Sequence, residues 1–123
     1  MAGDRAPRDS VAAVLARYAG AAAAHGRATL DKNISYREVN KQYRILAKAL
    51  EQLRCRGPDA QLALLGLLDD PDPSVRGWAA RDALEFAPQQ AEACLAELAK
   101  LPGLIGFDAE MVLKEWRAGR LRP

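Results

Sequence analysis

The stretch LGLLDDPDPSVRGWAARDAL, residues 65–84, decides the fold of this chain. An apolar segment ends there in an acidic turn with two prolines, and a second apolar pattern starts directly behind the turn. Asp72 is a good N-cap, and Pro73 suits the first helical position, where its missing N–H is harmless. The apolar residues that follow recur on one helical face: Val75, Ala79, Ala83 and Phe86. The stretch therefore predicts two consecutive helices joined by a tight turn.

This pair of helices is similar to the hairpins of HEAT-type repeat proteins. In those proteins an Asp of the turn and the Arg after the Val form a polar ladder between hairpins. Asp70 or Asp72 with Arg76 resembles that pair. One hairpin cannot bury its apolar face alone, so we expect stacked neighbours and a binding surface rather than a catalytic pocket.

Apolar periodicity along the rest of the chain predicts further helices. We expect six helices in three antiparallel pairs, over residues 10–24, 35–56, 59–68, 73–87, 88–100 and 107–118. His25 and Gly26 are predicted to end the first helix, and Gly119 the last. Few aromatic residues and abundant alanine favour closely packed helices over strands. The predicted fold is all-α, a short HEAT-like α-solenoid, with a single domain at residues 10–123 behind a flexible N-terminus at residues 1–9.

The same periodicity assigns apolar side chains to the core. The predicted core positions of the second and third helices are Tyr36, Val39, Tyr43, Leu46, Leu50, Leu53, Leu62, Leu65 and Leu68. Trp116 lies within the apolar stripe of the last helix and is predicted to be core as well. Trp78, in contrast, falls on the charged side of its helix. Two interpretations stay open for this indole, an anchor for a partner or a side chain buried against the next hairpin.

Several protein classes are excluded by composition. No apolar run is long enough to cross a bilayer, and the charged N-terminus lacks the apolar core of a signal peptide, so we expect a cytosolic protein. Cys55 and Cys94 lie in different predicted helices without metal-ligand spacing, and reduced thiols are expected, with a disulfide as the alternative. We expect no metal site and no cofactor.

The net charge of +2 hides an asymmetry along the chain. Residues 1–58 carry eleven Lys/Arg and five Asp/Glu, whereas residues 59–116 carry four and eleven. Four cations of the second helix are predicted to form a basic line about 16 Å long, opposite its apolar stripe: Arg37, Lys41, Arg44 and Lys48. Such a line can follow phosphates. A merely solvated face is the alternative, since no aromatic base reader accompanies the line.

Catalytic motifs are missing from the sequence. The lone His25 lies at a predicted helix end and is expected to cap the helix or face solvent. The chain has no Gly-rich phosphate loop, no paired-cysteine metal motif and no nucleophile elbow. We therefore expect a protein that is not an enzyme.

The closing segment GFDAEMVLKEWRAG, residues 106–119, supports a family resemblance. Together with the DPDPSVR turn at residues 70–76 and the helix over residues 36–53, it resembles a short bacterial HEAT-like family, domain of unknown function 2019. The resemblance extends from residue 10 to the end. It implies a small cytosolic protein of a kind often associated with antibacterial-toxin loci, where such a protein acts as the immunity protein.

The first hypothesis is a non-enzymatic immunity protein, monomeric when free, that binds a cognate toxin with a basic surface. The helix over residues 73–87 and the last helix would present the partner-binding residues, Trp78, Arg81, Asp82, Glu85, Glu110 and Lys114. One alternative is a nucleic-acid-binding HEAT-like protein that uses the basic line, with a DNA glycosylase as its enzymatic version. The glycosylases of this type use more hairpins than this chain provides. A general adaptor protein is the remaining alternative.

Overall fold

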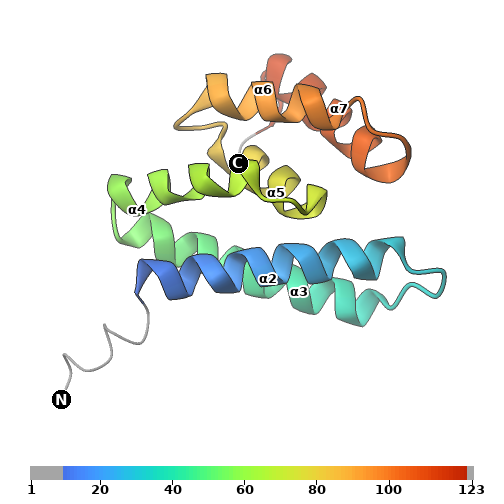
Figure 1. The fold of residues 1–123 in the computed structure, drawn as a ribbon, viewed down its shortest axis with the longest axis horizontal. Helices are drawn as coiled ribbons and strands as arrows, with labels where there is room; N and C mark the ends of the chain where they lie inside the picture. The colour runs from blue at the N-terminus through green and yellow to red at the C-terminus, as the bar shows by residue number, and fades with distance from the viewer. Residues whose placement is uncertain (1–9, 122–123) are drawn as a thin grey trace. The chain divides into compact units, whose positions relative to one another are not determined.

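Residues 10–121 are described in a computed structural model (Figure 1). Within that range the chain contains six α-helices, one 3-10 helix and no strand, so the all-α prediction is confirmed. The elements are α2 Val11–Leu30, α3 Tyr36–Cys55, α4 Pro58–Leu62, η2 Ala63–Asp69, α5 Pro73–Ala83, α6 Pro88–Leu98 and α7 Gly103–Arg117. The predicted flexible N-terminus, residues 1–9, lies outside the described residues.

The chain divides into two compact units, which we name the N-terminal unit (Met1–Ala63) and the C-terminal unit (Leu64–Pro123). The single domain and the solenoid stacking of three helical pairs stay predictions. Between residues 10 and 121, no helix combines the length and the apolar character needed to cross a membrane.

The N-terminal unit is built on an antiparallel hairpin of α2 and α3 (Figure 1). Serine hydroxyls cap both helices, because Ser10 accepts the backbone N–H of Ala13 at 3.1 Å and Ser35 accepts that of Glu38 at 3.3 Å. Both helices contribute large buried side chains, namely Val14, Tyr18, Leu46, Leu50 and Leu53. The local cap signals and the apolar periodicity therefore agree in this unit.

The predicted end of the first helix is wrong. His25 and Gly26 lie inside α2, which continues to Leu30. A glycine in a helix interior costs about 1 kcal/mol relative to alanine. Packing of α3 along α2 outweighs that cost, since most helical stability in proteins comes from tertiary packing.

The predicted core is also wrong at three positions of the N-terminal unit. Tyr36 and Tyr43 are 72% and 48% exposed, and Leu62 is 48% exposed. The two tyrosines lie at the edge of the buried sector of α3, where a phenolic hydroxyl can stay in water. Leu62 ends α4, and the change to 3-10 geometry at Ala63 alters the angular step between residues, so that Leu64 becomes the buried leucine.

The C-terminal unit packs α5, α6 and α7 around an apolar core rich in small residues. The buried members are Ala80, Ala83, Leu84, Ala91, Leu95, Leu98, Ala109 and Leu113. Val75 and Ala79 are buried as predicted, and Phe86 packs against this core half-buried. The small alanine side chains let the helix backbones approach closely.

Prolines begin several of the shorter helices. Asp72 caps α5 through Oδ1, which accepts the Ser74 N–H at 2.8 Å, and Pro73 occupies the first turn as predicted. Pro58 and Pro88 stand in the same position in α4 and α6. The fixed φ of proline suits the first turn, where its absent N–H would have no helical partner.

The last helix begins four residues earlier than predicted, at Gly103. Gly103 has φ 79°, a left-handed conformation that glycine adopts without strain. At Gly106 a Cβ would overlap the carbonyl oxygen of Leu101, so the segment before α7 passes directly against the helix. Gly119, with φ 76°, follows the end of α7, and its predicted role as the stop is confirmed.

Candidate functional site

Arg76 of α5 fixes the turn that precedes its own helix. Its Nη1 donates to the carbonyl oxygens of Asp70 at 2.8 Å and Pro71 at 3.3 Å. Asp70 Oδ1 in turn accepts the Asp72 N–H at 2.9 Å. The predicted ladder residues thus meet within one turn, where Arg76 binds backbone carbonyls. A ladder to another hairpin stays a prediction.

The predicted binding face of α5 is less exposed than the sequence indicates. Asp82 is only 2% exposed, with the Arg81 guanidinium 3.6 Å from its carboxylate. Trp78 and Arg81 are half-buried, and the Arg81 guanidinium lies 5.7 Å from the Trp78 ring centroid, a cation–π distance. Glu85 is exposed in the turn after α5. The expectation that Asp82 is available at the surface is therefore wrong, because tertiary packing buries it, whereas about 33% of the Arg81 side chain stays exposed.

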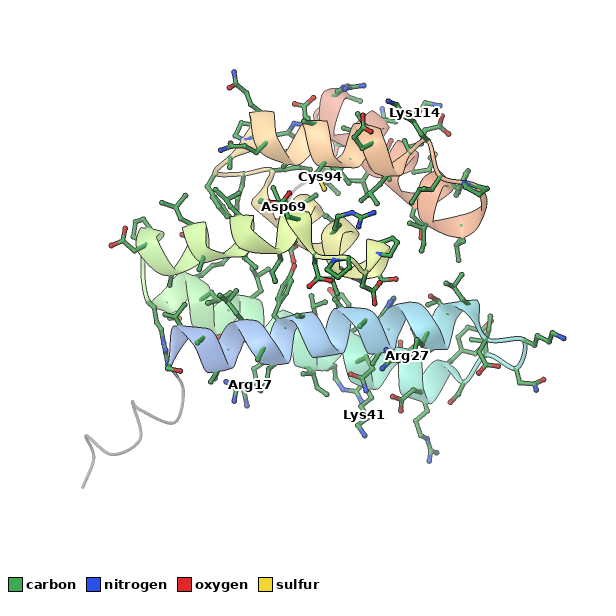
Figure 2. All side chains as sticks on the ribbon, in the orientation of Figure 1. Arg17, Arg27, Lys41, Asp69, Cys94 and Lys114 are labelled. Atoms are coloured by element: carbon green, nitrogen blue, oxygen red, sulfur yellow. The ribbon has the colours of Figure 1, made fainter. Side chains whose placement is uncertain are left out.

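The last helix carries an exposed apolar strip. Phe107 is 56% exposed and Leu104 is 44% exposed, and the half-buried Met111 lies on the same side, since residues three and four apart share a helix face. Glu110 and Lys114, two of the predicted partner-binding residues, are exposed beside the strip. Lys114 projects from α7 in Figure 2. We name these five residues the α7 face.

The exposure of Leu104 and Phe107 was not predicted from the sequence. Leu104 precedes the predicted helix, and Phe107 was expected only as its first residue. A signal was nevertheless present, because Phe107 lies opposite Trp116 and outside the apolar stripe at 100° per residue. An aromatic residue outside the stripe of its helix indicates an exposed aromatic.

The other side of α7 is anchored to α6. The half-buried Trp116 donates from Nε1 to Glu92 Oε2 at 3.2 Å, and Arg117 Nε lies 3.4 Å from Glu92 Oε1. After the helix, Arg120 Nε donates to both carboxylate oxygens of Glu115 at 3.0 and 3.1 Å. This hydrogen bonding holds the pKa of Glu115 below its ordinary value. The α7 face thus lies on a helix whose opposite side is bonded to α6 and whose C-terminal end is held by Arg120.

The N-terminal unit presents the predicted basic line. All four cations on α3 are exposed, which confirms this part of the prediction: Arg37, Lys41, Arg44 and Lys48. Their position opposite the buried side of α3 follows from the helical period.

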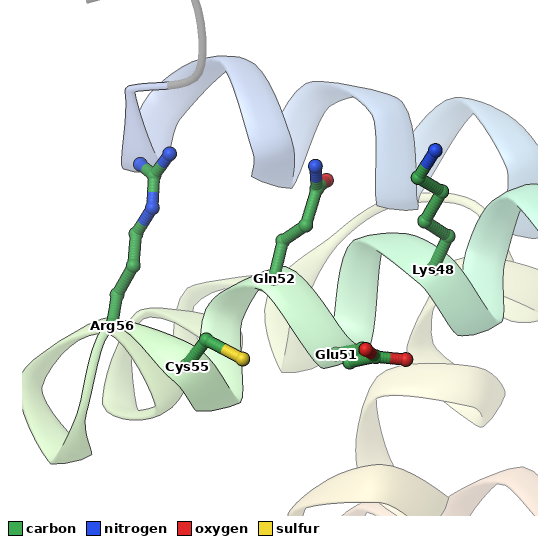
Figure 3. Close-up of a pocket in the computed structure, with 5 residues that line it drawn as sticks. All are labelled: Lys48, Glu51, Gln52, Cys55 and Arg56. Carbon is green, nitrogen blue, oxygen red and sulfur yellow. The ribbon is translucent and has the colours of Figure 1, made fainter. Parts of the chain in front are cut away.

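A shallow hollow lies beside the end of the basic line (Figure 3). It is lined by Lys48, Glu51, Gln52, Cys55 and Arg56, which belong to one side of α3 and its C-cap. Lys48, Gln52 and Arg56 extend in the same direction in Figure 3, whereas Cys55 points away from them. A thiol nucleophile needs an adjacent base. The lining offers cations, an amide and one carboxylate but no imidazole, so it does not form a nucleophile–base pair.

The described residues hold few reactive groups. Between residues 10 and 121, no three His, Cys, Asp or Glu side chains gather closely enough to hold a metal ion. His25 is half-buried within α2, so the expected capping role at a helix end is wrong. Both cysteines are free thiols, Cys55 exposed and Cys94 half-buried. Burial raises the pKa of the Cys94 thiol, with Arg76 opposing and Asp69 adding to that shift.

Comparison with known families now places the chain. The sequence model of the family described as Domain of unknown function (DUF2019) matches residues 13–116. The chain belongs to this family. The match runs from α2 into the last turn of α7, so it includes residues of both units. No curated protein sequence matches this DUF2019 protein.

The DUF2019 chain is similar to a protein of known structure. The crystal structure of the protein RPA1889 from Rhodopseudomonas palustris CGA009 matches it with a TM-score of 0.85 at 26% sequence identity. The alignment covers 94% of this chain and 95% of that chain. This likeness supports the all-α fold.

Proposed function

We propose that this protein is a non-catalytic binding module that docks a partner protein through the α7 face. The observation that carries the proposal is Phe107, a large aromatic side chain that stays 56% exposed on a helix whose other side is packed and hydrogen-bonded. Burial of a side chain of this size contributes about 1.5–3 kcal/mol. Aromatic residues are enriched at the core of protein interfaces.

The charge around the strip specifies the chemistry of the partner. Asp108 and Glu110 are exposed on α7 on either side of Phe107. Complementary charge accelerates association and excludes unsuitable partners. The expected partner therefore offers an apolar pocket with a basic rim.

The residues of α5 have a smaller part in this proposal. Asp82 is buried, and Trp78 and Arg81 are half-buried against each other. Glu85 stays exposed at the end of the helix. We therefore propose Trp78, Arg81 and Glu85 as secondary contacts of the partner, and we propose no direct contact for the buried Asp82.

More specifically, we propose an immunity protein that neutralises a cognate bacterial toxin in the cytosol. The resemblance to small helical proteins of antibacterial-toxin loci supports this role. A nuclease or nucleotide-modifying toxin carries the basic surface that suits an acidic unit. Inhibition is then either occlusion of the toxin active site or locking of the toxin from a remote surface.

The proposal predicts that the gene next to the one for this protein encodes a toxin, and the growth of bacteria that express the product of that gene tests it. Co-expression of the wild-type protein should restore growth. Phe107→Ala should abolish protection and weaken binding by about ten- to a hundredfold, because about 1.4 kcal/mol corresponds to a tenfold change in Kd. Glu110→Lys should slow association more than it speeds dissociation.

Leu62→Ala is the matched control, since Leu62 is 48% exposed but lies in the N-terminal unit. It should protect as well as the wild type. A folded Phe107→Ala protein that protects equally well would exclude the α7 face as the contact. Failure of the wild-type protein to bind or to neutralise the neighbouring product would reject the immunity role.

A further inference from the structure

The exposed side of α3 carries two parallel rows of side chains. The first row is the basic line, which extends about 16 Å at 1.5 Å per residue. The second row contains Tyr36, 72% exposed, and Tyr43, 48% exposed, which are seven residues apart and therefore on one face. The two rows lie about 100° apart around the helix. Tyr36 and Tyr43, which were predicted to lie in the core, thus border the cations.

The electrostatics of the hairpin reinforce the basic row. Residues 10–63 contain nine Lys/Arg and four Asp/Glu. Arg17 of α2 projects to the same side of the hairpin as Lys41 in Figure 2, and it donates to Gln52 Oε1 of α3 at 3.2 Å. The cations of α2 therefore add to those of α3.

The acids of this hairpin weaken the positive potential only in part. Asp31 Oδ1 accepts the Asn33 N–H at 2.8 Å, and the half-buried Glu38 accepts from Gln42 Nε2 at 2.7 Å. Glu51 is exposed at the end of the basic row, and Asp59 is exposed on α4. From residue 37 to residue 48, α3 nevertheless carries four cations against one acid, Glu38, so the basic row stays positive overall.

We propose that this exposed side of α3 binds single-stranded nucleic acid, with phosphates along the basic row and bases stacked on the tyrosines. A positively charged track beside aromatic rings is the arrangement by which proteins hold single strands without reading their sequence. A duplex keeps its bases stacked inside and leaves the tyrosines without a ring to contact. An acidic protein offers no regular series of charges to match four cations in line.

This inference is independent of the proposed function, because it uses the other unit and the opposite charge. The α7 face and the α3 rows share no residue. Loss of one activity is therefore expected to leave the other intact.

Fluorescence anisotropy with a labelled oligothymidylate of about 20 nucleotides tests the inference. The logarithm of the binding constant should fall against the logarithm of salt concentration with a slope of about −3, as four phosphate contacts on a single strand give. Lys41→Glu with Arg44→Glu should weaken binding at least about tenfold and reduce the slope by about half. Tyr36→Ala should weaken binding about five- to tenfold and leave the slope unchanged, because stacking releases no counterions.

Lys100→Glu is the matched control for Lys41→Glu alone, since it changes the net charge equally through an exposed lysine of the C-terminal unit that lies outside the α7 face. It should bind as the wild type does, and circular dichroism should show each variant folded. Any of three results would overturn the inference: no binding at low salt, equal weakening by Lys41→Glu and Lys100→Glu, or a duplex of the same length bound as tightly. Tyr36→Ala with unchanged affinity would remove the stacking and leave a nonspecific polyanion contact in its place.

Discussion

In the N-terminal unit the cations of α3 lie at the surface, whereas in the C-terminal unit several charged side chains hold the fold together. Arg76 binds the carbonyls of the turn before α5, Asp82 is buried beside Arg81, and Glu92 binds Trp116. The basic charge of one unit is therefore available to partners, while much of the acidic charge of the other has internal contacts.

We attribute this difference in the use of charged side chains to the lengths of the helices in the two units. α2 and α3 have 20 residues each, and long amphipathic helices bury much apolar surface in a single pairing. α5 and α6 have 11 residues each, a length at which an isolated helix is marginal, so caps and polar contacts matter more. The net charge of a unit thus does not measure the charge that it offers for recognition. Among the large apolar residues described in the acidic unit, Phe107 is the most exposed.

Substitution of one glycine in each unit gives the largest expected contrast. Gly106→Ala should lower the free energy of unfolding by about 2–4 kcal/mol, because the new Cβ overlaps the Leu101 carbonyl oxygen and the backbone must shift. Gly20→Ala in α2 should instead raise it by about 0.5–1 kcal/mol, since a Cβ there meets nothing within 4 Å. Urea unfolding followed by circular dichroism measures both. Equal stability of the two variants would show that the segment before α7 yields without cost.

Removal of a charged side chain should lower the free energy of unfolding in the C-terminal unit and leave it nearly unchanged in the N-terminal unit. Asp82→Ala should lower the free energy of unfolding by about 1–3 kcal/mol, because a buried carboxylate is lost and Arg81 keeps a charge without this partner. Lys41→Ala, on the exposed side of α3, should change it by less than about 0.5 kcal/mol. Thermal unfolding of both variants is the measurement. A larger loss from Lys41→Ala would reverse the contrast between the units.

The smallest expected contrast between the units is in the reactivity of their cysteines, one in each unit. Iodoacetamide should alkylate the exposed Cys55 at least about tenfold faster than Cys94 at neutral pH. Burial raises the pKa of the Cys94 thiol, so little reactive thiolate is present until the pH rises above the ordinary range for a cysteine. Peptide mass spectrometry over time distinguishes the sites. Rapid alkylation of Cys94 would indicate frequent local opening of the C-terminal unit.

Features that depend on neighbouring residues could be predicted from the sequence. Asp72 and Pro73 start α5, and Gly119 ends α7, as expected, because capping involves atoms only two or three residues apart. The exposed basic line on α3 was predicted for the same reason, since a helical period fixes which residues share a side.

Features that depend on tertiary packing could not be predicted in this way. Gly26 was expected to end a helix, but α2 continues to Leu30 because it packs along α3. Asp82 was expected at the surface, and its burial depends on residues distant in the sequence. Tyr36 has an apolar ring, but its exposure is decided by where the packed part of the hairpin ends.

The prolines at the helix starts have a consequence for the unfolded chain. Helices α4, α5, α6 and α7 begin at residues 58, 73, 88 and 103, so a new helix starts every fifteen residues. At the first three of these positions a proline ring holds the backbone near helical φ before any contact has formed. The denatured chain consequently has fewer conformations to lose at each helix start. These prolines therefore stabilise the native protein by lowering the conformational entropy of the unfolded chain, without adding a contact to the folded one.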